Sequence, residues 1–173
     1  MFFRGPADAI IKLALTQCAI LGSPLLVIVS AANPNVFTTL DIPENVILLS
    51  ARVPAEAFAR LMAASSFVVV PVNPGLVRGA GEATVVNAMW HGRATICADD
   101  ICAFEYVQEA VTGYVTPPGE VANLRERIIE LRNDPEKAAA MGCAARQIAV
   151  ADLTSEHFCR RLRALGSILA ASK

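Results

Sequence analysis

Two glycines with a spacing suited to phosphate binding stand in the middle of the chain. Gly79 and Gly81 follow the apolar run 67–71, and the pattern over 82–91 predicts a helix. A glycine-containing loop that leads into a helix presents free backbone N–H groups and the positive end of the helix dipole, which suit a phosphate. With a further strand expected at 94–97, this order predicts a nucleotide or sugar-nucleotide site. The alternative is a plain strand-to-helix connection.

The same glycines approximate a dinucleotide-binding fingerprint. Gly79, Gly81 and Thr84 occupy the positions of G-x-G-x-x-G, and Asp99 lies about where an acid would bind the ribose. The fingerprint needs its glycines directly after the strand, whereas residues 72–78 intervene here, and Thr84 replaces the third glycine. We therefore rank an NAD-binding protein below a sugar-nucleotide site.

Histidine and glutamate side chains offer weaker candidates. His91 stands near the expected end of a helix, where a cap or packing role is the main interpretation and proton transfer the alternative. Glu105 and Glu109 either form an acid–base pair or lie on a solvated helix face. Neither histidine of the chain has Ser/Asp or Cys/Asn partners at a readable spacing, so no catalytic triad is predicted.

The composition indicates a globular domain and excludes several classes of function. The 173 residues are 54% hydrophobic and 18% charged, with a net charge of −1, which gives no reason to expect nucleic acid binding. The apolar runs are too short to span a bilayer, and no signal peptide pattern opens the chain. The five cysteines form no C-x-x-C pair. We therefore expect a cytoplasmic protein with reduced, mostly buried thiols and no metal site.

The elements that must position these residues alternate between strand and helix. Short apolar runs predict strands at 25–30, 46–49, 67–72, 94–97 and 113–116, and helical patterns separate them at 7–21, 54–64, 82–91 and 103–109. Strands that are apolar on both faces belong to a parallel sheet covered on both sides. The alternation predicts an α/β fold with a doubly wound parallel sheet. Residues 1–5 lead almost at once into a helix, so no full strand is expected there.

The last third of the chain is predicted to be helical. A helix over 121–131 ends near Asp134, which caps a second helix with Pro135 in its first position. The final helix is capped near Thr154 or Ser155. Its apolar face is formed by Phe158, Leu162, Leu165 and Leu169, and its basic patch by Arg160, Arg161 and Arg163. The basic patch is either a solvated face or a contact for anionic lipid headgroups.

Several segments together resemble one family of enzymes. Residues 87–92 are similar to the element EAMxxG, 112–119 resemble tGxlvppG, and 45–71 look like the run that precedes a donor site. Asp134-Pro135 and Met141-Gly142 match a late helical pattern. These are features of the C-terminal, donor-binding domain of GT-B glycosyltransferases, in particular the family 4 retaining enzymes (glycosyl transferases group 1). The resemblance covers about residues 4 to 165.

The resemblance implies a binding site for a nucleoside-diphosphate sugar, such as a UDP- or GDP-sugar, which serves as donor substrate without a metal or other cofactor. The Arg4 cation would meet the diphosphate, the backbone at Arg52 and Val53 would meet the base, and the backbone N–H groups of residues 81–84 would approach the sugar and phosphate. Glu105 matches a donor-side glutamate. The implied residues are Arg4, Gly5, Arg52, Val53, Gly79, Gly81, Glu82, Ala83, Thr84, Asn87 and Glu105.

Two acidic positions of the family are replaced in this chain. They correspond to Gly79, which has no side chain to contact the sugar, and to Asn87, which can accept a hydrogen bond from a ribose hydroxyl but carries no charge. Glu82 lies nearby as a substitute. A Gly-Gly pair that precedes the family's donor-side glutamate is also missing from 100–104. A degenerate, non-catalytic binding or interaction domain is therefore the alternative function.

The resemblance also implies an incomplete active site. GT-B catalysis takes place between two domains, because the transition state needs groups on both sides of the reacting centre. We expect residues 1–173 to form a single C-terminal-like domain that lacks its N-terminal acceptor domain. The isolated chain should then be catalytically weak or inert. Its expected location is the cytoplasm, with peripheral contact at the inner face of the membrane.

Overall fold

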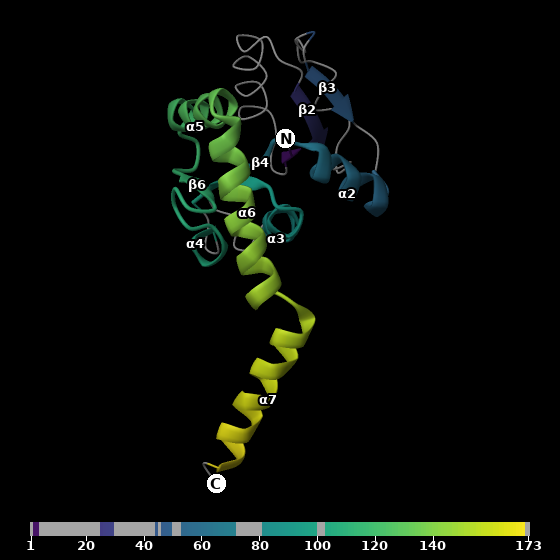
Figure 1. Ribbon diagram of the computed structural model, residues 1–173, viewed down its shortest axis with the longest axis vertical. Helices are drawn as coiled ribbons and strands as arrows, with labels where there is room; N and C mark the ends of the chain where they lie inside the picture. The colour runs from purple at the N-terminus through teal and green to yellow at the C-terminus, as the bar shows by residue number, and fades with distance from the viewer. Residues whose placement is uncertain are drawn as a thin grey trace.

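The protein is an α/β domain with a long C-terminal helix that extends away from it (Figure 1). The computed structural model describes residues 2–3, 25–29, 44, 46–49, 53–71, 81–99 and 103–171. The helix predicted over 7–21 lies outside the described residues.

Within the described ranges, six strands form two parallel three-stranded sheets. The strands are β1 Phe2–Phe3, β2 Leu25–Val29, β3 Val46–Leu49, β4 Phe67–Val70, β5 Ala94–Ala98 and β6 Gly113–Thr116. One sheet has the order β1-β2-β3 and the other β4-β5-β6. Because β1 contacts β4, the strands follow one another in space as β3-β2-β1-β4-β5-β6. This is the strand order of a doubly wound nucleotide-binding fold, and it confirms the predicted fold class.

The five predicted strands are present; two have the predicted ends and the other three differ by one or two residues at one end. β1 pairs in parallel with β2 through Phe2 opposite Ile28 and Phe3 opposite Val29. It was not predicted because two residues are too few to show an apolar pattern.

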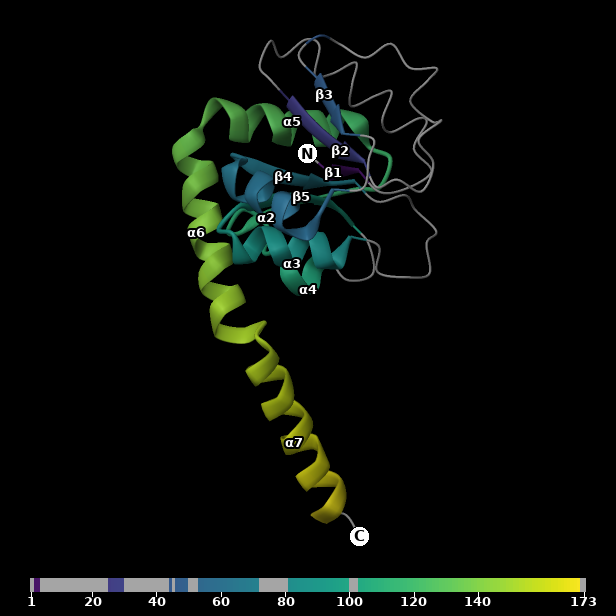
Figure 2. The ribbon, with the colours of Figure 1, turned by 90° about the vertical axis from the view of Figure 1, so that its right-hand side faces the viewer.

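Helices cover the β4-β5-β6 sheet on both faces (Figure 2). The described helices are α2 Ala55–Ala64, α3 Glu82–Trp90, α4 Ala103–Tyr106, α5 Val121–Asn133, α6 Pro135–Asp152 and α7 Ser155–Ala171, of which α7 extends away from the sheet. Helix α3 contacts β4 and β5, α5 contacts β5 and β6, and α6 contacts both α3 and α5. Asp134 caps α6 as predicted, since its Oδ1 accepts a hydrogen bond from the Lys137 N–H at 2.9 Å. Helix α4 ends at Tyr106, earlier than predicted.

The core lies between β4-β5 and helices α2, α3 and α6. Val68, Val70, Met62 and Met89 are buried there together with Ala145 of α6. Burial on both faces of β4 and β5 explains why their sequences are continuous apolar runs rather than alternating ones.

Helix α6 crosses the amino edge of this sheet at a backbone-to-backbone contact. A Cβ atom added to Gly142 would lie 2.1 Å from the carbonyl oxygen of Gly92, in the turn between α3 and β5. No side chain fits there, so glycine allows α6 to approach the turn closely. Ala145 and Ala149, one and two turns later, are fully buried.

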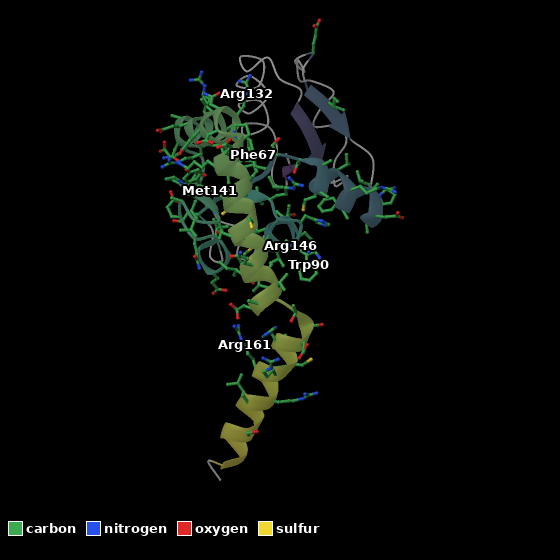
Figure 3. All side chains as sticks on the ribbon, in the orientation of Figure 1. Phe67, Trp90, Arg132, Met141, Arg146 and Arg161 are labelled. Atoms are coloured by element: carbon green, nitrogen blue, oxygen red, sulfur yellow. The ribbon has the colours of Figure 1, made fainter. Side chains whose placement is uncertain are left out.

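Two arginines cap the carboxyl ends of neighbouring helices. The Arg146 Nη1 on α6 donates to the carbonyl oxygen of Trp90, the last residue of α3, and its guanidinium lies 5.7 Å from the Trp90 ring (Figure 3). The Arg93 Nη2 donates to the carbonyl oxygen of Ala63 in the last turn of α2. Both cations meet the negative end of a helix dipole, so both stabilise it.

A charged cluster joins β6 to the corner between α5 and α6. The Glu130 carboxylate accepts hydrogen bonds from Tyr114 Oη at 2.6 Å, Lys137 Nζ at 2.5 Å and Arg127 Nη1 at 2.9 Å. The Arg127 guanidinium lies 4.4 Å from the centre of the Tyr114 ring. Hydrogen bonds from Lys137, Tyr114 and Arg127 lower the pKa of Glu130 from 4.5 to about 2. The Glu130 carboxylate in turn raises the pKa of Lys137.

Helix α7 leaves the body after Leu153 and contributes none of the described buried residues (Figures 1 and 2). Its exposed Cys159, and the exposed Cys143 of α6, show that the prediction of mostly buried thiols was wrong for these two residues, whereas Cys97 is buried. Among the helices that the structure describes, none is both long and apolar enough to cross a membrane.

Replacing Gly142 by Ala should destabilise the fold. The added methyl group meets the Gly92 carbonyl, so α6 must move, and overpacking of this kind costs about 1–3 kcal/mol. Gly166→Ala on α7 is the matched control, because its Cβ would meet nothing within 4 Å. Urea denaturation should show a lower free energy of unfolding for Gly142→Ala alone. Equal stability of the two variants would contradict the proposed contact.

Removing the Glu130 charge should make stability less dependent on acid pH. A carboxyl whose pKa is lower in the folded protein contributes stability above its ordinary pKa, and that stability is lost as the pH falls from about 4.5 to about 2. At pH 7, Glu130→Gln should lower the free energy of unfolding by about 1–2 kcal/mol, and the difference should shrink in that acid window. Glu126→Gln, at an exposed position of the same helix, should change it by less than about 0.5 kcal/mol. A Glu130→Gln difference that persists at pH 2 would count against the charge-based explanation.

Candidate functional site

The topology places the candidate site at the carboxyl ends of β1 and β4. The strand order reverses its direction between these two strands, and open α/β sheets bind ligands outside the carboxyl ends at such a point. Helix α6 covers the opposite, amino edge. In the sequence, Arg4 and Gly5 come directly after β1, and Gly81 begins the helix that follows β4.

Gly81 forms the N-cap of α3 in a left-handed conformation. Its φ is 99° and its ψ is −13°, values that residues with a Cβ rarely adopt. Its carbonyl accepts from the N–H groups of Thr84 at 2.8 Å and Val85 at 3.0 Å, which starts the helix. No side chain caps this helix end. The N–H groups of Glu82 and Ala83 have no acceptor among the described residues, so this end offers two donors to an anion.

The first two turns of α3 carry most of the predicted site residues that the structure describes. Glu82 and Thr84 are half-buried, whereas Ala83 and Asn87 are exposed. The Asn87 Nδ2 donates to the Ala83 carbonyl at 2.7 Å, and the Oδ1 of this exposed side chain has no donor among the described residues. A carboxamide oxygen in this position can accept a hydrogen bond from a hydroxyl group.

The carboxyl end of the same helix is fully satisfied. His91 is the C-cap of α3, and its N–H donates to the Asn87 carbonyl at 3.0 Å. His91 thus occupies the C-cap position through its backbone N–H. Arg146 also donates to the Trp90 carbonyl, so protein groups satisfy the carbonyls at the carboxyl end of α3. The amino end instead presents the N–H donors of Glu82 and Ala83.

The remaining predicted site residues lie on other elements. Val53 is half-buried just before Pro54, the N-cap of α2, and Glu105 is exposed on α4. Both α2 and α4 contact α3. Glu109 does not pair with Glu105: its Oε2 accepts from the Val115 N–H at 2.8 Å, and its Oε1 lies 3.9 Å from Arg127. Arg4, Gly5, Arg52 and Gly79 lie outside the described residues.

Asp99 is a further candidate at this edge. It follows β5 directly, is exposed, and its N–H donates to the Thr116 carbonyl at 2.7 Å. The sequence indicated Asp99 only as the acid of a dinucleotide fingerprint. Its place immediately after a buried strand was the signal that could have assigned it to the carboxyl edge.

The dinucleotide fingerprint does not have its usual spacing. Strand β4 ends at Val70, nine positions before Gly79, so the glycines do not directly follow the strand. Within the described ranges, no group of three His, Cys, Asp or Glu side chains could hold a metal ion. What the described part of the site offers is hydrogen bonding from a helix end and from Asn87.

Comparison with known proteins identifies relatives of this architecture. The family model described as "Glycosyl transferases group 1" matches residues 36–148. No curated protein matches the sequence significantly. Sucrose-phosphate synthase from Thermosynechococcus elongatus has a similar structure, with a TM-score of 0.76 and 18% identity over 99% of this chain and 45% of that one.

Two other solved structures bear on the site and the domain. HepE from Anabaena, in complex with UDP-glucose, matches with a TM-score of 0.62 and 22% identity over 86% of this chain and 43% of its own. The C-terminal domain of the group 1 glycosyl transferase LpcC from Francisella tularensis matches with a TM-score of 0.71 and 13% identity over 89% of this chain and 85% of that domain. The chain thus spans less than half of the first and second of these three proteins but most of an isolated C-terminal domain.

Proposed function

We propose a function from one premise: this chain belongs to the glycosyl transferases group 1 family. Its fold is that of one half of a GT-B glycosyltransferase. On this proposal it binds the nucleoside-diphosphate sugar of a retaining glycosyl transfer. The donor lies at the carboxyl ends of β1 and β4, against the amino end of α3.

The uncapped amino end of α3 carries this proposal. Gly81 has no side chain, and the N–H groups of Glu82 and Ala83, which have no acceptor among the described residues, can donate to a phosphate oxygen. A helix N-terminus favours negative charge through its dipole as well as its donors. HepE, which has the same fold, was solved with UDP-glucose, and this supports a UDP-sugar as the first donor to test.

The other residues take roles that follow from their chemistry. Arg4 is proposed to meet the diphosphate, where a guanidinium can form two parallel hydrogen bonds. Arg52 and Val53 are proposed to face the base, and Asn87 a ribose hydroxyl through its Oδ1. Glu105 is proposed on the sugar side. No metal or further cofactor is part of this proposal.

Binding, rather than turnover, is the function proposed for this chain on its own. It spans 45% of the sucrose-phosphate synthase chain, and we propose that an N-terminal GT-B domain supplies the acceptor side of a complete enzyme. A non-catalytic sugar-nucleotide-binding domain is the second candidate. It is favoured by Asn87, a neutral side chain whose Nδ2 is already bonded to the Ala83 carbonyl.

Replacing Gly81 by Ala should weaken nucleotide binding. A Cβ at φ 99° forces the loop to change and moves the N–H groups of α3, so the Kd for UDP should rise about tenfold in isothermal calorimetry. Gly92→Ala is the matched control: Gly92 also has a positive φ, of 66°, but lies at the amino edge. Both variants should lose similar stability, and only Gly81→Ala should lose affinity. An equal loss of affinity in both variants would show that the effect is only one of stability.

Replacing Asn87 by Glu should strengthen nucleotide binding. A carboxylate accepts a ribose hydroxyl in a charge-assisted hydrogen bond, so the Kd for UDP or GDP should fall about fivefold. Gln147→Glu, which adds a negative charge at an exposed position of α6 away from this edge, is the control and should leave the Kd unchanged. Unchanged affinity of Asn87→Glu for both nucleotides would remove Asn87 from the site, and preferential binding of NAD by the unmodified chain would replace the proposal with the dinucleotide alternative.

A further inference from the structure

Asp99 places a carboxylate on a fixed backbone at the carboxyl edge of the sheet. It directly follows β5, and its N–H donates to the Thr116 carbonyl of β6 at 2.7 Å, so the pairing of these two strands extends to it. The Thr116 Oγ1 in turn donates to the Cys97 carbonyl at 3.3 Å. The Asp99 side chain is exposed, and no described residue forms a hydrogen bond or ion pair with its carboxylate. A charged group held on so rigid an element can select among ligands.

Strand alternation places Asp99 on the face of the sheet that α3 covers. Val70 of β4 pairs with Cys97 of β5, and both lie in one core cluster with Val85 of α3. Residues two apart in a strand lie on the same face, so Asp99 continues this face about 7 Å beyond Cys97. The Val85 N–H donates to the Gly81 carbonyl in the first turn of α3. Asp99 is thus placed on the side of the amino end of α3, where we propose that the donor binds.

The charge of Asp99 determines which part of a donor it can contact. A carboxylate repels a diphosphate, whereas it accepts strong, charge-assisted hydrogen bonds from hydroxyl groups. In a nucleoside-diphosphate sugar, hydroxyl groups occur on the ribose at one end of the diphosphate and on the sugar at the other. Asn87, six residues along α3 from Gly81, is proposed for the ribose. The sugar is therefore the part that suits Asp99.

Two further carboxylates make the surroundings of this sugar negative. Glu82 is half-buried in the first turn of α3, and Glu105 is exposed on α4, which contacts α3. No described residue forms an ion pair with either side chain. A sugar that carries its own carboxylate would add one more negative charge beside these acids. A neutral sugar brings only hydroxyl groups, which can donate to them.

We infer that Asp99 selects a neutral sugar over an acidic one in the donor. Its carboxylate accepts a hydrogen bond from a hexose hydroxyl, and its charge repels the carboxylate of a hexuronate. The inference rests on the proposed function, because it needs a diphosphate at the amino end of α3. It goes further by assigning the class of sugar that the site admits and a residue that distinguishes it.

Isothermal calorimetry with UDP, UDP-glucose and UDP-glucuronate tests this inference on the full 173-residue chain. The two sugars differ only at C6, which is an alcohol in one and a carboxylate in the other. At about 50 mM NaCl the Kd for UDP-glucuronate should be about tenfold higher than that for UDP-glucose, and about 500 mM NaCl should reduce this ratio. Asp99→Asn should raise the Kd for UDP-glucose about fivefold and lower the ratio, without weakening the binding of UDP. Asp99→Glu should retain the preference for the neutral sugar.

Asp152→Asn is the matched control, because it makes the same chemical change at the exposed last residue of α6. It should leave all three Kd values unchanged. The inference alone is overturned if the chain binds UDP but does not distinguish the two sugars, or if Asp99→Asn binds UDP-glucose as tightly as the unmodified chain. It is also overturned if Asp99→Asn weakens UDP and UDP-glucose equally. If the unmodified chain binds neither UDP nor GDP, the proposed function fails and the inference fails with it.

Discussion

The contact between the backbone of α6 and the turn at Gly92 determines how the rest of the domain is arranged. With glycine at position 142, α6 lies directly against the Gly92 carbonyl and covers the amino edge of the sheet. Ala145 and Ala149 then reach the core, and Arg146 reaches the carboxyl end of α3. A bulkier helix surface would keep all three of these groups too far away.

This arrangement gives α3 two very different ends. Its carboxyl end is held by His91, by Arg146 and by the close approach of α6. Its amino end has no side-chain cap and begins at a glycine with positive φ. The protein thus fixes the helix from the edge that carries no candidate function. No described residue accepts from the two donors at the other edge, as a binding site built from a helix end requires.

Apolar patterns predicted the regular elements well, for an identifiable reason. Strands β4 and β5 are buried on both faces, so their sequences are continuous apolar runs with clear ends. Asp134 and Pro135 predicted the start of α6 because each has one favoured role at a helix N-terminus. Strand β1 escaped prediction, since Phe2 and Phe3 owe their conformation to pairing with β2. The same holds for Gly142, whose importance depends on a partner fifty positions earlier in the chain.

The candidate site was predictable in its position but not in its geometry. Glycine spacing and the following helix located Gly81, but its φ is a property of the backbone, not of residue types, and so is the lack of any described acceptor for the N–H groups of Glu82 and Ala83. That difference also governs how such a site changes over evolutionary time. Substitution replaces side chains and leaves main-chain atoms in place, so neutral drift can change the side chains around this helix end without removing the amide donors. Selection for the two amide donors then acts mainly on Gly81, which sets the conformation of this helix end. Gly81 should therefore vary less among descendants than any charged neighbour.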